Sequence, residues 1–350
     1  MRLHKGSQTV KLLEVLWFYE QLPFSALEMM SADYEWNKDC MQRLIKEGYV
    51  GVIKDTNLKS LYLKPAGQKA WLEYCERVGR PVNPPRKPSI VYNADKARRV
   101  ERINEARMLV DAAGFHSSYL TAPEAKSLLE QDAARQSDNI KYSRFAGILF
   151  TEKGGLMVYH FGSGNLHLNS SGELNAKFAA DKLYRQRGGK EALPRFSMLV
   201  LGTSVTTAMD MLKYSDLIAQ KDKARSGHVL KRHFNFKDFR KVFDDILFMP
   251  IMPEAREMMR ILAAPGNGLY DAPRRYRQEG RHMVNLLECR LHLWNHFREQ
   301  IPEDKPVDFL CYRWQAPLVV EYFIGQKEMV DPRCCLVSME LAGQIVDLTP

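Results

Sequence analysis

Two carboxylates and an arginine lie close together in the stretch "YDAPRRYRQEGRHMVNLLECRL". Asp271 precedes Glu288 by seventeen residues, and Arg290 follows two positions later. An Asp and a Glu can together hold Mg²⁺, and a lysine beside them can activate the attacking water of a nuclease. Arginine keeps its proton and is a poor substitute for that lysine. The pattern therefore favours a loop Asp and a strand-end Glu, and an active Mg²⁺-dependent nuclease or nicking enzyme stays open as an alternative.

The other reactive residue types give no motif. His292 and His296 are four residues apart, but Leu293 stands where an H-E-x-x-H site needs its glutamate. The six cysteines show no C-x-x-C spacing. The G-x-G of "YHFGSGNLH" fits a loop better than a dinucleotide fingerprint, and neither G-x-x-x-x-G-K-[ST] nor G-x-S-x-G occurs. We expect no catalytic residue, no metal and no cofactor.

A basic segment, "KDKARSGHVLKRHFNFKDFRK", covers residues 221 to 241. Its eight Lys and Arg against two Asp give +6. Such a segment can bind phosphates while the interleaved phenylalanines stack on bases, and it can equally be an exposed loop whose phenylalanines lie in the core. The candidate phosphate-binding residues of this secondary patch are Lys221, Lys223, Arg225, Lys231, Arg232, Lys237, Arg240 and Lys241.

The N-terminal stretch changes from a helical to a strand-like period. Residues 9 to 22 predict a helix that Pro23 ends, Ser25 begins a second short helix, and residues 34 to 47 predict a third that Gly48 ends. "YVGVIKD" and "SLYLKPAG" then alternate as two strands joined by "DTNLK", and "GQKAWLEYCERVG" predicts a closing helix. This order is typical of a winged helix-turn-helix, in which the third helix enters the major groove and the hairpin is the wing.

The predicted third helix turns Met41, Leu44 and Ile45 inward, so its other face is available for contacts. Hydrogen-bonding and cationic side chains suit base edges and phosphates. A solvated face or a protein-interaction scaffold would carry similar residues, so that alternative stays open. The candidate DNA-binding residues of the helix and the wing are Trp36, Lys38, Gln42, Arg43, Lys46, Lys54, Asn57 and Lys59.

The rest of the chain predicts a second, larger domain. Four prolines in "VGRPVNPPRKPSIVYN" indicate a stiff basic linker, and a helix ending at Gly114 follows it. Alternating strands and helices then indicate an α/β (α+β) domain with a mixed central sheet. The predicted domains are a winged helix-turn-helix at 1–80, a linker with a connecting helix at 81–114, and the α/β domain at 115–350.

Composition limits the partners. The 350 residues hold 51 Lys and Arg against 42 Asp and Glu, a net charge of +9, which favours a polyanionic partner. No apolar run approaches the roughly 18 residues that cross a bilayer, and the first residues lack the pattern of a signal peptide. We expect a cytoplasmic protein that does not bind membranes.

Several segments resemble the replication-relaxation proteins of Gram-positive conjugative and mobile elements. They are "YLKPAGQKAW", "YSRFAGILFTEKGGLMVYHFG", "FSMLVLGTSVTTAMDML", "FDDILFMPIMPEAREMMRIL" and "DFLCYRWQAPLVVEYF". The resemblance implies a winged helix followed by a restriction-endonuclease-like α/β domain. It implies no catalytic residue at any position of this sequence.

Together these observations predict a DNA-binding accessory or regulatory protein of a plasmid or conjugative element, acting in replication, mobilisation or transcriptional control. The expected partner is double-stranded DNA, with other mobilisation or replication proteins as further partners. A homodimer is expected because helix-turn-helix proteins commonly bind paired half-sites.

Overall fold

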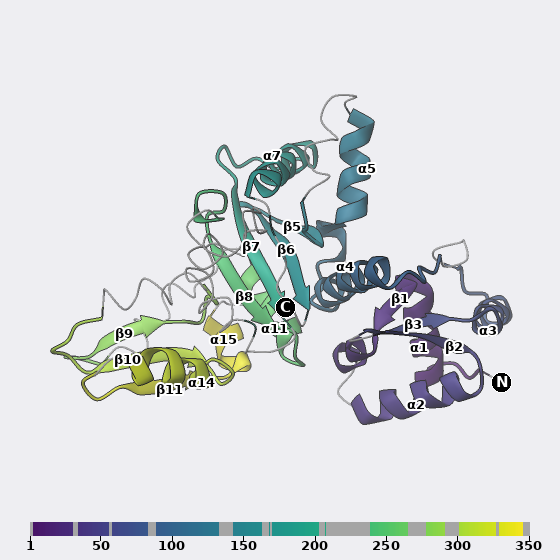
Figure 1. The fold of residues 1–350 in the computed structure, drawn as a ribbon, viewed down its shortest axis with the longest axis horizontal. Coiled ribbons are helices and arrows are strands. Elements are labelled where there is room, and N and C mark those ends of the chain that lie inside the picture. Colours follow the sequence, from purple (N-terminus) through teal and green to yellow (C-terminus); the bar gives the residue numbers. More distant parts are fainter. Residues whose placement is uncertain are drawn as a thin grey trace, which may run out of the picture. The chain divides into compact units, whose positions relative to one another are not determined.

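The computed structural model divides the chain into two compact units, unit 1 at Met1–Ala112 and unit 2 at Ala113–Pro350 (Figure 1). Each unit is described by itself below. The structure describes residues 3–30, 34–55, 58–82, 89–132, 143–162, 168, 170–202, 207, 239–264, 278–290, 301–326 and 329–345.

Unit 1 contains helices around a small antiparallel sheet, whose strand order is β1-β3-β2. The predicted third helix and the hairpin are confirmed to within about two residues at most ends. In chain order the elements are α1 (Gln8–Tyr19), β1 (Gln21–Pro23), the 3-10 helix η1 (Phe24–Met29), α2 (Tyr34–Lys46), β2 (Val50–Asp55), β3 (Leu58–Leu63), α3 (Pro65–Arg77) and α4 (Ala94–Ala112).

The core of unit 1 follows from the helical and strand periods. Apolar residues spaced three and four apart on α1 bury one face, and α2 adds two more fully buried residues. Gly48, with φ +81, allows the sharp turn from α2 into β2. The core residues include Leu12, Leu13, Leu16, Trp17, Met41, Leu44, Val50, Leu61 and Trp71.

One sequence prediction for unit 1 is wrong in detail. The first helix ends at Tyr19 instead of continuing to Pro23, because residues 21–23 pair antiparallel with β3 as a third strand. Such a short strand carries no readable alternation. On α2, Met41 and Leu44 are buried as predicted, and Ile45 is half-buried and packs against the same core.

Helix α4 was predicted as part of a connecting segment, but it packs on the sheet of unit 1. It contacts β1, β3 and η1. Its Asn104 side-chain amide donates to the main-chain oxygens of Tyr19, at 2.6 Å, and of Gln21, at 2.8 Å. The Tyr19 hydroxyl donates to Asp111 at 2.8 Å. Polar contacts therefore fasten α4 to the end of α1 and to β1.

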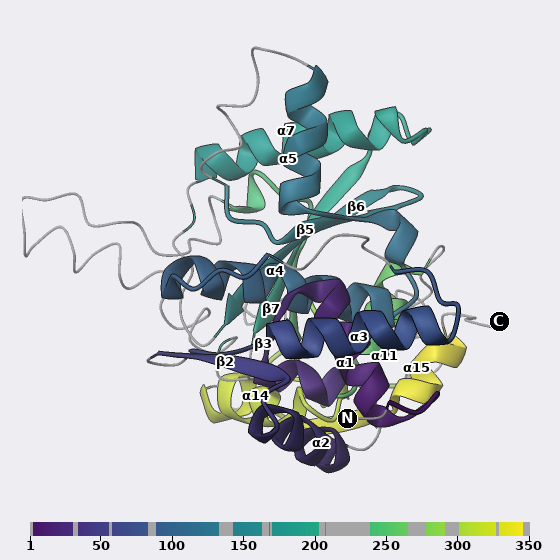
Figure 2. The ribbon, with the colours of Figure 1, turned by 90° about the vertical axis from the view of Figure 1, so that its right-hand side faces the viewer.

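Unit 2 has a mixed five-stranded sheet in the order β4-β5-β6-β7-β8. Strands β4, β5 and β6 pair antiparallel, and β6, β7 and β8 pair parallel. Helix α5 contacts α7, and both are seen crossing in Figure 2. The elements are the 3-10 helix η2 (His116–Ser118), β4 (Tyr119–Thr121), α5 (Ala122–Asp132), β5 (Gly147–Thr151), β6 (Gly154–Gly162), α7 (Ser170–Gln186), β7 (Arg195–Gly202), β8 (Ile246–Pro250) and α11 (Ala255–Ala263).

A second sheet follows in unit 2, so the single central sheet predicted from the sequence is two sheets in the described residues. Its three strands are parallel in the order β11-β10-β9. An isolated bridge between Leu247 and Arg290 links this region to β8. The elements are β9 (His282–Asn285), β10 (Val307–Tyr312), α14 (Ala316–Leu318), a π-helical turn η5 (Val319–Phe323), η6 (Ile324–Gln326), β11 (Arg333–Val337) and α15 (Met339–Ile345).

The predicted α/β class is therefore confirmed: both units combine helices with sheets, and unit 2 mixes parallel and antiparallel pairing. Among the described residues, no helix is both long and apolar enough to span a bilayer.

Candidate nucleic-acid interface

Helix α2 is held by a buried polar contact with its neighbours. Asn37 is fully buried, donates to the main-chain oxygen of Leu27 at 3.2 Å, and accepts a hydrogen bond from Gln8 of α1. A buried amide with its hydrogen bonds satisfied fixes the rotation of the helix about its axis. This fixed rotation decides which side chains α2 turns outward.

The outward face of α2 carries most of the predicted contact residues. Trp36 is 54% exposed, which is unusual for so large an apolar side chain. Gln42, Arg43 and Lys46 are also exposed. The Arg43 guanidinium lies 3.5 Å from the Thr9 hydroxyl, so it sits beside the start of α1 and keeps other donors available.

Helix α2 and the residue after it have no net charge together. From Tyr34 to Glu47 there are three acids (Glu35, Asp39, Glu47) and three bases (Lys38, Arg43, Lys46). Lys38 pairs with Glu35 at 2.9 Å, and this hydrogen bond, with the charge of Glu35, raises the pKa of Lys38. Helix α2 alone therefore attracts a polyanion weakly and is better suited to directional hydrogen bonds than to long-range attraction.

The hairpin β2–β3 has a different electrostatic character. Lys54 and Lys59 are directly opposite in the antiparallel register, and both are exposed. Like charges in opposite positions destabilise a hairpin. Within the described residues neither lysine has an ion pair with a carboxylate. The Lys59 ammonium lies 3.9 Å from the centre of the Phe24 ring, and Asn57 lies outside the described residues.

The back of the hairpin contacts α4. Arg98 lies 3.5 Å from the carboxylate of Asp55, so that acid is paired away from the two lysines. Glu101 is buried and accepts a hydrogen bond from Ser60, but its Oε1 has no hydrogen-bond partner in the described structure. Burial has the largest effect and raises the pKa of Glu101. The hydrogen bond from Ser60 lowers this pKa, and the charge of Glu105 raises it again. The resulting pKa is about 7.

Most of the predicted secondary basic patch lies outside the described residues: Lys221, Lys223, Arg225, Lys231, Arg232 and Lys237. Arg240 and Lys241 are described, and both are exposed. Arg240 lies 3.8 Å from the carboxylate of Asp245 and donates to the main-chain oxygen of Asp244. Arg240 therefore takes part in a local ion-pair network.

The carboxylate pair considered for a nuclease is only partly described, because Asp271 lies outside the described residues. Glu288 and Arg290 do come together, with 2.7 Å between the carboxylate and Nε, and Arg290 also lies 3.7 Å from Asp245. Burial, and then the charge of Asp245, raise the pKa of Glu288. A guanidinium thus occupies the position beside Glu288 that a bound cation would take.

The residue that sequence reasoning missed here is Asp245. Arg195 lies 3.4 Å from its carboxylate, and Arg240 and Arg290 also approach it. Arg195 begins β7 and Asp245 immediately precedes β8, which is parallel to β7. The "DD" before an apolar strand was the available signal, since the amino ends of neighbouring parallel strands meet. In the described parts of the chain, no three His, Cys, Asp or Glu residues are grouped so that they could hold a metal ion.

Comparisons with protein-family models, with curated proteins and with solved structures found no match for this chain.

Proposed function

We propose that unit 1 is a winged helix-turn-helix that binds double-stranded DNA, with α2 in the major groove and β2–β3 as the wing. The observation that carries the proposal is the combination of an outward polar face on α2 with two facing lysines on the adjacent hairpin. The order α1-β1-η1-α2-β2-β3, and the sheet order β1-β3-β2, support the same assignment.

The two parts have different tasks in this proposal. Gln42 and Arg43 present amide and guanidinium groups, which pair with the major-groove edges of adenine and guanine. Lys54 and Lys59 bind the backbone, because a phosphate between them offsets their mutual repulsion. The charge balance of α2 then keeps sequence-independent binding through that helix low, which favours specificity over general affinity.

We propose further that the chain is a cytoplasmic accessory or regulatory protein of a plasmid or conjugative element, working as a dimer and with other mobilisation or replication proteins. The sequence resemblance supports this setting. Unit 2 is then a restriction-endonuclease-like domain that binds DNA or a partner without cleaving it. The pairing of Glu288 with Arg290 supports the absence of cleavage, since a paired carboxylate is a poor ligand for Mg²⁺.

Binding of the full chain to duplex DNA at several salt concentrations tests the proposal. One duplex carries random sequence, and the other carries the promoter or transfer-origin region adjacent to its own gene. We expect tighter binding to its own region, with the logarithm of the association constant falling linearly with the logarithm of the salt concentration. Weak binding that shows no preference would refute the proposal.

A protein-interaction module is the second candidate function, and the low net charge of α2 with its exposed Trp36 favours it. Exposed tryptophan is frequent at the centre of protein interfaces. This candidate predicts that Arg43→Ala and Lys46→Ala leave the affinity for nucleic acid unchanged. DNA binding predicts a loss for both substitutions.

A further inference from the structure

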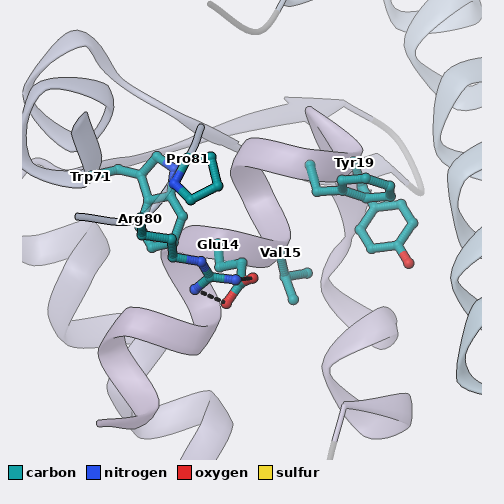
Figure 3. Close-up of a pocket in the computed structure, with 7 residues that line it drawn as sticks. Glu14, Val15, Tyr19, Trp71, Arg80 and Pro81 are labelled. Carbon is teal, nitrogen blue, oxygen red and sulfur yellow. Dashed lines mark hydrogen bonds and ion pairs between the residues drawn. The ribbon is translucent and has the colours of Figure 1, made fainter. Parts of the chain in front are cut away.

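Unit 1 contains a surface pocket of roughly 370 Å³ on the side of α1 away from the buried core residues of that helix. Four of its lining residues are Glu14, Val15, Phe18 and Tyr19, which share one face of α1 because they lie at helical spacing. Trp71 of α3 and the segment that follows α3, Arg80 and Pro81, form the opposite wall (Figure 3). The volume lies at the lower end of the range for small-molecule sites.

Aromatic rings contribute to both walls of the pocket. Trp71 packs against Tyr74 with 5.7 Å between the ring centres, and only 3% of the residue is exposed. Phe18 and Tyr19 pack edge to face at 4.8 Å. Tyr74 and Arg80 already cover the Trp71 ring, so a flat ring that enters the pocket packs edge to face against the aromatic side chains, without loss of their side-chain freedom. The pocket is therefore suited to a planar aromatic group.

The polar groups of the pocket include two donors and one carboxylate. Arg80 makes a paired contact with Glu14, with 3.0 Å from Nη1 to Oε2 (Figure 3), while its guanidinium carbon lies 5.6 Å from the centre of the Trp71 ring. The indole Nε1 of Trp71 has no hydrogen-bond partner within the described residues. A buried donor of this kind is unfavourable unless an acceptor reaches it.

We propose that this pocket binds a small planar aromatic anion. The ring packs edge to face between Phe18 of α1 and Trp71 of α3, and the carboxylate pairs with Arg80 in exchange for Glu14. Arg80 keeps its position because it also rests on the Trp71 ring, whereas Glu14 can turn to solvent from the surface of α1.

A cation is the poorer ligand because Arg80 would repel it. The Glu14–Arg80 pair is also partly exposed, at 37% and 43% of the side chains, and exposed ion pairs exchange partners at little cost. The proposed ligand site is independent of DNA binding, because none of the residues that line the pocket is a candidate DNA-binding residue.

Isothermal titration calorimetry of the full chain tests the site with four probes. Benzoate and 2-naphthoate are flat anions, benzamidine is a cation of similar shape to benzoate, and cyclohexanecarboxylate is an anion without an aromatic ring. We expect the two flat anions to bind and the other two to bind at least about tenfold more weakly, since charge-assisted pairing and ring packing each contribute an effect of about that size.

Substitutions in the ion pair identify the site. Arg80→Gln is expected to weaken 2-naphthoate binding about tenfold, while Glu14→Gln keeps or strengthens it by removing the competing carboxylate. Both side chains are partly exposed, so both variants are expected to fold. Lys69→Gln, on an exposed position of α3 and outside the pocket, is the control and is expected to leave binding unchanged.

Three results would overturn the proposal. Absence of binding by all four probes at millimolar concentration would mean that there is no such site. Tighter binding of benzamidine than of benzoate would mean that Glu14 pairs with the ligand and that the pocket selects cations. Equal loss of affinity in Arg80→Gln and Lys69→Gln would mean that the anions bind elsewhere.

Discussion

Charged side chains differ in their pairing between two regions, the hairpin side of unit 1 and the amino ends of the parallel strands of unit 2. In unit 1, Lys54 faces Lys59, and buried Glu101 has an oxygen without a partner. In unit 2, Asp245 lies among three arginines, and Asp308 at the start of β10 is paired with both Arg281 and Arg333 at 2.9 Å. In these two clusters of unit 2 the charges are therefore paired within the fold, while the facing lysines of the hairpin have no carboxylate partner in the described residues.

This difference indicates where a polyanion can gain the most. A phosphate that approaches a compensated arginine must compete with a carboxylate already in place, so the net gain is small. A phosphate that approaches the two facing lysines removes a repulsion. Under the proposed function, we therefore expect the hairpin to attract DNA and the arginine networks to stabilise the fold, and each expectation can be tested by substitution.

The largest expected effect comes from Glu101, the uncompensated buried acid. Its pKa is about 7 in the folded unit against 4.5 ordinarily, so the folded state holds the proton more tightly. The resulting stability is complete below pH 4.5 and is lost as the pH rises through 7. At about 1.4 kcal/mol per pH unit, the loss is about 3 kcal/mol. Glu101→Gln is therefore expected to be more stable than the natural protein at pH 8 and nearly equal to it at pH 4.5.

Urea unfolding of both proteins at a series of pH values measures this effect. Glu124→Gln, at the start of α5 in unit 2, is a control for the general loss of one acid, and it is expected to leave the pH dependence of unit 1 unchanged. The charges that face Glu101 are Glu105, Arg102 and Arg98, all on α4. An unchanged pH dependence in Glu101→Gln would mean that these arginines already compensate the acid, and the contrast between the units would fail.

The second largest effect is expected in the free energy of unfolding when Asp308 of unit 2 is neutralised. Asp308→Asn leaves Arg281 and Arg333 without their shared carboxylate, and only 1% of the Asp308 side chain is exposed. We expect a loss of about 2 kcal/mol in the free energy of unfolding, below the range for a fully buried pair because Arg333 is 44% exposed.

Asp331→Asn is a matched control for this measurement. Asp331 pairs with the same Arg281, but 63% of its side chain is exposed, so the expected change is within about 0.5 kcal/mol. DNA affinity should remain unchanged in both variants at low denaturant. A loss of DNA affinity in Asp308→Asn, measured while the protein is still folded, would show that this network belongs to the interface.

The sequence predicted the elements better than it predicted the charge pairs. The helical stripe of α2, its end at Gly48 and the alternation of the hairpin are local signals, and each depends on a few neighbouring residues. The strand β1 was missed because three residues cannot show a period. The pairing of Arg195 with Asp245 spans fifty residues and depends on which strands lie side by side, which no local pattern specifies.

The candidate interface shows the same limit. The outward direction of Gln42, Arg43 and Lys46 was predictable from the apolar stripe on the opposite face. The opposition of Lys54 and Lys59 needed the register of the hairpin, which a turn of uncertain length left open. The pairing of Asp55 with Arg98 needed the packing of α4 on unit 1 and could not be inferred from the linker composition.

A contact on α2 is expected to give an intermediate effect. Arg43→Ala removes a donor from the proposed major-groove face and is expected to cost about 1.5 kcal/mol in DNA binding, more for the preferred sequence than for random duplex. Fluorescence anisotropy with the two duplexes measures the difference. Asp39→Ala, on the same exposed face, is expected to keep or increase affinity. An equal loss on both duplexes in Arg43→Ala would reassign this residue to the backbone.

The smallest effect is expected at Lys54, and it tests the comparison of the two regions most directly. Lys54→Ala should lower the slope of log affinity against log salt by about one and weaken binding equally on all sequences, by about 1 kcal/mol or less at physiological salt. It should also leave the unfolding free energy unchanged or slightly increased, because it removes a like-charge pair. Lys69→Ala is the control, since Lys69 is also exposed but lies 3.8 Å from Glu73 on α3. If the two variants lower the salt slope equally, general basicity explains the attraction; if only Lys54→Ala lowers it, the absence of compensation at the hairpin is what a polyanion recognises.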